Sequence, residues 1–241
     1  MNNWLKNNLF GPVLGQCLFC LEPTSNQYSL CEHCESALPD NKLHCLICSS
    51  PILLTQADQP ALICGQCQKN PPSYNTSLIP FLYASPLKQS IAALKFHRNL
   101  SYVPLLAYIF TRSLKSRQSK MPECIVPVPL HPKRLQQRGF NQALELLSII
   151  STQLGIPLDY SLCQRNKDTP FQSGLSAKQR KQNLRNAFTV SKPQPYKHIA
   201  IFDDVVTTGT TVNELARKLK ASGVEIIEVW AIARTVSANQ K

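Results

Sequence analysis

Apolar and polar positions along residues 73–241 follow two alternating patterns. Short, mostly apolar runs predict buried strands, over 78–83, 124–128, 197–203 and 224–233. Apolar residues at three- and four-residue spacing predict helices, over 86–96, 104–114, 141–154 and 212–220. The alternation predicts an α/β fold with a mostly parallel sheet and helices on both faces.

One segment combines a strand end, two carboxylates and a helix start: His198–Val212, which reads H-I-A-I-F-D-D-V-V-T-T-G-T-T-V. Backbone N–H groups at a helix N-terminus and threonine hydroxyls favour an anion such as phosphate. Asp203 and Asp204 cannot bind phosphate, but they suit sugar hydroxyls or a ligand-held Mg²⁺. A ribose carrying a 5-phosphate meets both demands, whereas an ordinary strand-turn-helix explains the five hydroxyl and glycine positions poorly.

The segment is neither a Walker A loop nor a G-x-G-x-x-G fingerprint. It closely resembles the phosphoribosyl pyrophosphate (PRPP) loop of type I phosphoribosyltransferases. The resemblance implies Mg²⁺ bound with PRPP and a catalytic role for Asp203 and Asp204. The predicted PRPP-binding residues of the segment are Asp203, Asp204, Val206, Thr207, Thr208, Gly209, Thr210 and Thr211.

A second loop, over 125–142, leaves the strand at 124–128 and carries three prolines within six residues, which stiffen it. Lys133 and Arg134 are predicted to clamp a pyrophosphate, unless they only add to a basic surface. His131 is a weaker candidate for acid–base chemistry than for a structural or phosphate-donating role.

A third segment, 165–188, is polar and basic, with a helix expected from Ser176 to Phe188. It fits a mobile lid over a phosphate site or a surface that follows a single-stranded nucleic acid. The candidate nucleic-acid contacts are Arg138, Arg165, Lys178, Arg180, Lys181 and Arg185.

The formal net charge of +12 is unevenly distributed, at −2 for residues 1–70 and +14 for residues 71–241. A basic C-terminal part attracts phosphorylated ligands and nucleic acid. Residues 1–16 contain no continuous apolar run and are expected to form an amphipathic segment rather than a signal peptide. We also expect no membrane insertion, because no apolar stretch approaches the length of a membrane span.

Eight of the ten cysteines form four C-x-x-C pairs. The pairs are Cys17/Cys20, Cys31/Cys34, Cys45/Cys48 and Cys64/Cys67. Two such turns can complete a tetrahedral zinc site, so residues 17–72 are predicted to form a domain with two structural zinc ions, paired sequentially or cross-braced. Four disulfides are the alternative, disfavoured by an expected cytoplasmic location. Residues 73–241 are predicted to form the α/β domain.

Together these features resemble the ComF family of competence proteins. The resemblance rests on the C-x-x-C pairs, V-P-V-P-L-H-P-K-R…R-G-F-N-Q, R-x-x-x-T-x-x-Q-x-x-L-S-x-x-x-R-x-x-N…F and D-D-V-V-T-T-G-T-T. It implies a double zinc ribbon fused to a type I phosphoribosyltransferase-like domain. It also implies handling of incoming single-stranded DNA at the cytoplasmic side of the membrane, with a ComFA-like helicase/translocase as partner.

Three functions stay open on the sequence. The first is a PRPP-binding protein of natural transformation that carries single-stranded DNA. The second is an active phosphoribosyltransferase with an unknown acceptor. The third is a regulator in which PRPP binding alters DNA or partner affinity without turnover.

Overall fold

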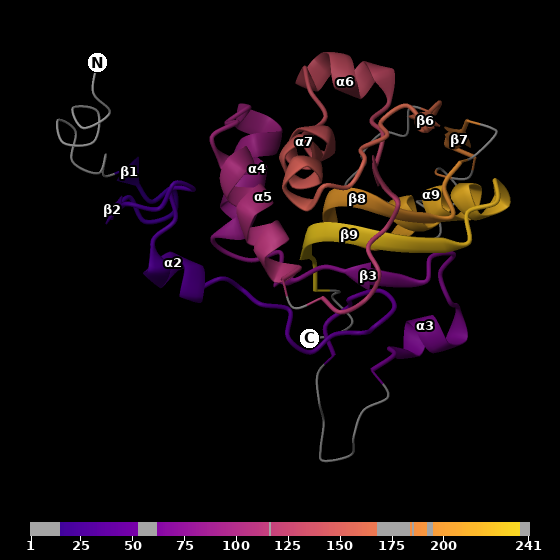
Figure 1. Cartoon of the computed structure of the whole chain (residues 1–241), viewed down its shortest axis with the longest axis horizontal. Coiled ribbons are helices and arrows are strands. Elements are labelled where there is room, and N and C mark those ends of the chain that lie inside the picture. The colour runs from indigo at the N-terminus through magenta and orange to yellow at the C-terminus, as the bar shows by residue number, and fades with distance from the viewer. Residues whose placement is uncertain are drawn as a thin grey trace. The chain divides into compact units, whose positions relative to one another are not determined.

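The structure is a computed structural model, and it describes residues 15–52, 62–115, 117–167, 184, 186–191 and 195–236 (Figure 1). The chain divides into two compact units, Met1–Leu38 and Pro39–Lys241. Of the expected amphipathic segment over 1–16, all but the last two residues lie outside the described residues.

The first unit is a small cysteine-bearing module. Strands β1 (Gly15–Gln16) and β2 (Pro23–Thr24) pair antiparallel, and the short helix α2 (Glu32–Ser36) follows. Cys31 caps α2, because its Sγ accepts a hydrogen bond of 3.4 Å from the backbone N–H of Cys34. Within its described residues, 15–38, the buried apolar side chains are Cys17, Leu30 and Cys34, so such a module needs a further source of folding energy.

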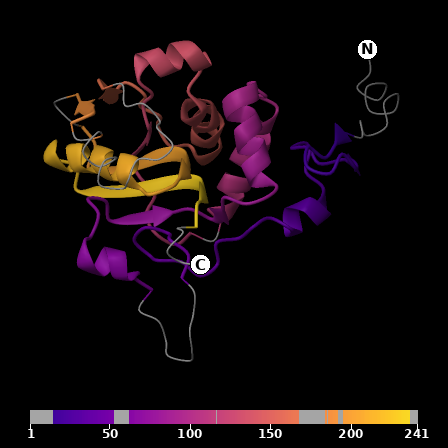
Figure 2. The same cartoon turned by 180° about the vertical axis from the view of Figure 1, so that it is seen from behind.

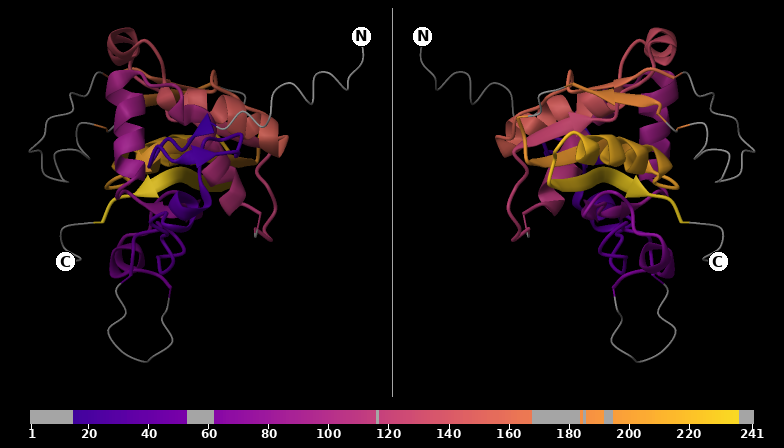
Figure 3. Two further views of the ribbon diagram at one scale, coloured as in Figure 1. Left: turned by 90° about the vertical axis from the view of Figure 1, so that its left-hand side faces the viewer. Right: turned by 90° about the vertical axis from the view of Figure 1, so that its right-hand side faces the viewer.

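A five-stranded sheet organises the second unit, and each of its strand pairs is parallel. Its order is β3-β9-β8-β5, and β4 also pairs with β9. The strands are β3 (Thr76–Leu78), β4 (Phe81–Leu82), β5 (Cys124–Pro127), β8 (His198–Val206) and β9 (Ile226–Arg234). The long strands β8 and β9 lie side by side at its centre (Figures 1 and 3).

Among the described residues, the remaining elements of the second unit are helices and a two-stranded antiparallel sheet, which Figure 2 shows from behind. The helices are α3 (Gly65–Lys69), α4 (Leu87–His97), α5 (Tyr102–Ser113), α6 (Pro132–Arg138), α7 (Gln142–Leu154) and α9 (Thr210–Ala221). Strands β6 (Cys163–Arg165) and β7 (Phe188–Val190) pair antiparallel.

The central strands are buried on both faces, as parallel sheets require. On one face, Ile201 and Val229 belong to the same core cluster as Leu215 of α9. On the other, the ring of Phe110 in α5 lies 5.3 Å from that of Phe202 and 5.9 Å from that of Trp230. The predicted α/β class, with a mostly parallel sheet flanked by helices, is confirmed.

A buried charge network closes the amino-terminal end of the sheet. Glu228 accepts hydrogen bonds from both terminal nitrogens of Arg117, at 2.6 and 2.9 Å, and from the indole N–H of Trp230 at 2.7 Å. His198 Nε2 lies 2.9 Å from the same carboxylate. The charges of Glu228 and Arg117 therefore neutralise each other in the protein interior.

Several element boundaries differ from the sequence predictions. The strand expected over 197–203 continues to Val206, so the two aspartates lie inside β8 rather than after it. The strand expected over 78–83 is divided into β3 and β4 around Pro80, which cannot donate a ladder hydrogen bond.

The loop expected over 125–142 contains the helix α6, which begins at Pro132. Proline suits the first position of a helix because its φ is already helical and its missing N–H would have had no partner within the helix. The helix expected from Ser176 to Phe188 lies mostly outside the described residues, but Phe188 itself begins strand β7. The helix over 141–154 is confirmed as α7, capped by Asn141 and ended by Gly155 at a φ of 65°.

Candidate functional site

Two carboxylates stand near the carboxyl end of β8. Asp204 is 1% exposed, whereas Asp203 is half-buried. Asp203 Oδ1 accepts from the backbone N–H of Asp204 at 2.9 Å, and Asp204 Oδ1 accepts from that of Val205 at 2.9 Å. Burial and the adjacent charge of Asp204 hold the pKa of Asp203 well above its ordinary value.

Lys95 of α4 is the cation that faces this pair. Its Nζ lies 2.6 Å from Asp204 Oδ2, and its side chain is 19% exposed. Burial lowers the pKa of Lys95, but the charges of Asp204 and Asp203 raise it above the ordinary value. The sequence analysis missed Lys95. A signal was present, because Lys95 follows Leu87 and Ile91 at helical spacing and so continues the buried stripe of α4.

The threonine turn, which we define as Thr207–Gly209, joins the carboxylates to helix α9. Thr207 and Thr208 are exposed, and Thr210 and Thr211 are half-exposed in the first turn of α9. Gly209 has a φ of 75°, which favours glycine there, and Thr208 Oγ1 lies 2.8 Å from Thr210 Oγ1. Val206 is 3% exposed and anchors the turn in the core. The turn therefore presents hydroxyls and helix N–H groups to solvent.

Helix α6 places three predicted cations beyond β5: Lys133, Arg134 and Arg138. Arg138 donates to Gln142 Oε1 at 2.6 Å. Burial lowers the pKa of Arg138. The charges of Asp204 and Asp203 raise this pKa, and the charge of Arg134 lowers it, so all three groups lie within electrostatic range of Arg138. Lys133 is exposed. The structure thus brings Arg138 within electrostatic range of the carboxylates.

His131 has a structural role in this arrangement, because its Nδ1 caps α6 by accepting from the backbone N–H of Lys133 at 3.3 Å. Of the predicted nucleic-acid contacts, Arg165 lies on β6 with its guanidinium 5.6 Å from the ring centre of Phe188. The other predicted contacts beyond α6 lie outside the described residues: Lys178, Arg180, Lys181 and Arg185.

The eight C-x-x-C cysteines form two separate clusters. The first contains Cys17, Cys20, Cys31 and Cys34, and the second contains Cys45, Cys48, Cys64 and Cys67. Within each cluster all sulfur atoms lie within 4.8 Å of one another, so the pairs combine sequentially. The second cluster belongs to the same unit as the sheet. The domain boundaries predicted at residues 17–72 and 73–241 stay a prediction.

Zinc fits both clusters. Four thiolates at about 2.3 Å from a tetrahedral ion are about 3.8 Å apart. The sulfurs of Cys20 and Cys31 are 3.6 Å apart, and those of Cys48 and Cys64 are 3.7 Å apart. Burial raises the pKa of Cys45, but backbone hydrogen bonds, the largest from Cys64, lower it to about 7. Each cluster can therefore hold a metal ion, whose thiolate bonds would supply folding energy.

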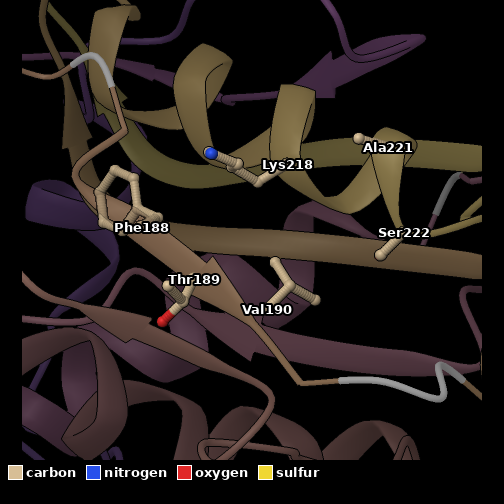
Figure 4. A pocket seen from close by; sticks show the side chains of 6 residues that line it. All are labelled: Phe188, Thr189, Val190, Lys218, Ala221 and Ser222. Carbon is tan, nitrogen blue, oxygen red and sulfur yellow. The ribbon is translucent and has the colours of Figure 1, made fainter.

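A pocket of about 260 Å³ lies at the far end of α9 from the threonine turn (Figure 4). It is lined by Phe188, Thr189, Val190, Lys218, Ala221 and Ser222. Lys218 Nζ donates to Asn186 Oδ1 at 2.9 Å, so its charge is engaged locally. This pocket and the carboxylate–threonine site are separate features of the molecule.

The chain is thus a mostly parallel α/β protein with two tetracysteine clusters and an acidic, threonine-rich strand end. Competence protein F of Haemophilus influenzae is 38% identical over 236 residues, which cover 95% of this chain and 94% of that protein. DNA utilization protein YhgH of Escherichia coli K12 is 36% identical over 231 residues, covering 93% and 99%. The chain belongs to the family of these two proteins, which confirms the ComF resemblance.

A more distant relative is Competence protein ComFC of Bacillus subtilis, which is 24% identical over 221 residues, covering 88% of this chain and 85% of that protein. No protein-family model matches the sequence. Among the residues that the structure describes, no helix combines the length and the apolar character that crossing a bilayer demands.

Solved phosphoribosyltransferases are among the structural neighbours. Adenine phosphoribosyltransferase of Leishmania tarentolae aligns with a TM-score of 0.37 and 13% identity, covering 62% of this chain and 78% of that one. UMP synthase of Leishmania donovani aligns with a TM-score of 0.34 and 17% identity, covering 57% and 23%.

Proposed function

We propose that this protein binds PRPP with Mg²⁺ at the carboxyl end of β8 and handles single-stranded DNA in natural transformation. The observation that carries the PRPP half is the succession of Asp203, Asp204 and the threonine turn at a strand end that runs directly into α9. Ligands of parallel α/β sheets bind beyond the carboxyl ends of the strands. The 5-phosphate accepts hydrogen bonds from the turn and from the first N–H groups of α9.

The carboxylates serve the other end of the same ligand. Asp203 is half-buried and can accept hydrogen bonds from ribose hydroxyls or contact a ligand-held Mg²⁺. Lys95 and Arg138 supply positive charge near these carboxylates, where a pyrophosphate attached to the sugar would lie, and Arg134 lies within electrostatic range of Arg138. Lys133 extends the same basic surface on α6.

The DNA half of the proposal rests on family membership and on charge. The relatives are named for competence and for DNA utilization, and residues 71–241 of this chain carry a net charge of +14. Basic residues that track a phosphate backbone are typical of sequence-independent binding. The proposed contacts are Arg138, Arg165, Lys178, Arg180, Lys181 and Arg185. A ComFA-like translocase as partner, and a cytoplasmic position near the inner face of the membrane, complete this proposal.

Calorimetric titration of the full chain with PRPP and Mg²⁺ tests the ligand. Thr208→Val removes an exposed hydroxyl while keeping the side-chain shape, and we expect a rise in Kd of about tenfold. Thr152→Val, which removes an exposed hydroxyl from α7, is the matched control and should leave Kd unchanged. A folded protein that releases no heat with millimolar PRPP and Mg²⁺ would overturn the proposal.

Catalysis is a second candidate function, favoured by the cations beside the carboxylates. A phosphoribosyl transfer develops negative charge on the departing pyrophosphate, and fixed cations stabilise that charge. Pyrophosphate release measured with nucleobases, ammonia and sugars as acceptors tests this function. Release with any acceptor, lost in Asp203→Asn, would establish turnover, whereas binding without release would leave PRPP as a ligand that regulates DNA affinity.

A further inference from the structure

Arg234, the last residue of β9, connects the threonine turn to the second tetracysteine cluster. It is 5% exposed. Its Nη1 donates to the carbonyl oxygen of Val206 at 2.9 Å and to that of Thr207. Its Nε donates to the carbonyl oxygen of Cys48 at 3.2 Å. One rigid guanidinium thus joins the residues that begin the turn to a cysteine of the cluster.

The charge of Arg234 points to the same connection. Among the described residues, Arg234 forms no ion pair with a carboxylate. A buried cation without a counter-charge is costly. The second cluster supplies one when it is loaded, because a divalent ion with four thiolates has a net charge of −2. A metal-loaded cluster therefore explains why Arg234 is tolerated in the interior.

Tyr74 lies near the same two features. Its side chain is 7% exposed, and its hydroxyl lies 3.8 Å from the point where a Cβ on Gly209 would be. Burial raises the pKa of Tyr74, the thiolate of Cys48 raises it further and Arg234 lowers it. Tyr74 therefore lies within electrostatic range of both the cluster and the guanidinium.

The second cluster is also fixed to the sheet by hydrogen bonds. Thr76 donates its hydroxyl to the carbonyl of Leu46 at 2.7 Å, and the hydroxyl oxygens of Ser49 and Ser77 are 2.7 Å apart. Cys48 packs against the core cluster that contains Val206. A displacement of the cluster loop on metal loss would therefore reach the turn through packed groups.

We infer that Arg234 is a positioning residue through which the metal ion of the second cluster sets the conformation of the threonine turn. The second cluster, which belongs to the same unit as the sheet, then helps to shape the anion site. The inference that the turn's ligand is PRPP rests on the proposed function. The coupling between metal and turn does not.

Hydrogen exchange of the amides of Asn213 and Thr235, which donate to the carbonyl oxygens of Gly209 at 2.9 Å and Val206 at 3.1 Å, tests the coupling on the full chain without ligand. We expect removal of the metal by a thiol-reactive mercurial to raise exchange at these amides about tenfold, which matches a loss of about 1.4 kcal/mol. Cys31→Ser, which disables only the first cluster, should leave exchange there unchanged. Unchanged exchange at these two amides after both ions have left would overturn the inference.

Variants of Arg234 separate positioning from simple loss of structure. In Arg234→Gln, with the metal content verified, we expect fast exchange at the same two amides that metal removal no longer increases. Arg234→Lys keeps the charge without the planar fork and should restore only part of the protection. An Arg234→Gln protein whose turn still responds fully to metal removal would contradict the role of Arg234.

Reciprocity gives a ligand-dependent test, because coupling between two sites acts in both directions. PRPP with Mg²⁺ should slow the release of the second cluster's metal ion to a chelator. The release of the first cluster's metal ion should not change. Loss of this effect in Arg234→Gln would support the inference, and its persistence would count against it. If PRPP does not bind at all, the proposed function fails while the exchange experiment still decides the coupling.

Discussion

Lys95 of α4 and Asp204 of β8 form a mostly buried ion pair, with 2.6 Å between Nζ and Oδ2. The pair joins a helix on one side of the sheet to the central strand at the candidate site. It also gives Asp204 a structural role that a strand-end carboxylate facing solvent would lack. Asp203 and Asp204 are therefore expected to respond in opposite ways to substitution.

Replacement of Lys95 by Met should destabilise the protein, because it leaves Asp204 buried without a counter-charge. Breaking a buried pair from one side costs about 3 kcal/mol. Urea unfolding, followed by fluorescence, measures this change. The double variant Lys95→Met with Asp204→Asn should recover part of the loss, since neither charge then remains unpaired. A free energy of unfolding equal to that of the wild type in Lys95→Met would contradict the pair's importance.

Replacement of Asp203 by Asn should stabilise the ligand-free protein at neutral pH. Burial and the charge of Asp204 raise the pKa of Asp203 above its ordinary value of 3.8, so the fold is favoured by the protonated carboxyl. That contribution is full below pH 3.8 and is lost as the pH rises through the raised pKa. We expect a rise in Tm of about 2–4 °C at pH 7.

The same Asp203→Asn variant should bind PRPP and Mg²⁺ more weakly. Asp203 would then be a residue that lowers the stability of the ligand-free protein but is needed for binding. Scanning calorimetry at pH 7 and pH 3 provides the comparison. The gain should shrink at pH 3, where the wild-type carboxyl is protonated. If the Tm difference between Asp203→Asn and the wild type were smaller at pH 7 than at pH 3, this would argue against a raised pKa of Asp203.

The Glu228 network predicts acid sensitivity. Burial raises the pKa of Glu228, but hydrogen bonds from Arg117 and Trp230 lower it below its ordinary value of 4.5. A depressed pKa stabilises the fold above pH 4.5, and this contribution is lost as the pH falls through the lowered value. Glu228→Gln should cost about 3 kcal/mol at pH 7 by leaving Arg117 unpaired.

Urea unfolding at pH 7, 4.5 and 3.5 should then show a smaller stability difference between wild type and Glu228→Gln as the pH falls. Comparison at each pH cancels any effect of acid on the metal clusters. Glu225→Gln, which removes an exposed carboxylate paired with Lys197, is the matched control and should change stability little. A constant difference across this range would rule out the ionisation of Glu228 as its source.

The proposed DNA-binding surface predicts a strong dependence of affinity on salt. For single strands, log K falls with log salt at a slope of about −0.7 per phosphate contacted. Arg138→Gln and Arg165→Gln should each reduce the magnitude of this slope by about 0.7, whereas Lys197→Gln, at the other end of the sheet, should not. Fluorescence anisotropy with a labelled oligonucleotide from 50 to 300 mM salt measures the slope. Equal slopes in all four proteins would place the DNA elsewhere.

The two tetracysteine clusters predict two bound metal ions per chain. Cys31→Ser should reduce the metal content from two ions to one and remove hydrogen-exchange protection from residues 15–38, because metal binding supplies most of the folding energy of so small a unit. Protection of β8 and β9 should persist. Elemental analysis combined with hydrogen exchange checks both statements, and a loss of protection throughout the chain would contradict two independent clusters.

Much of the fold was predictable from the sequence. The periodicities over 141–154 and 224–233 predicted α7 and β9, because a half-buried helix and a fully buried strand must repeat apolar residues in distinct ways. The C-x-x-C spacing likewise predicted two four-cysteine sets, since a tight turn presents both thiolates to one ion. Each of these features depends on residues close together in the chain.

Pairings between distant residues were not predictable in this way. Whether a carboxylate is buried, and which cation faces it, depends on how α4 packs against β8, more than a hundred residues away. Neither Lys95 nor Arg234 was singled out from the sequence. The sequence by itself determined the main helices and strands, the four C-x-x-C pairs and the threonine turn, but not whether the pairs combine sequentially. Only the tertiary structure decided that Lys95 neutralises Asp204 and that Arg234 joins the turn to the second cluster, because buried charges are compensated by whatever the packing brings near them.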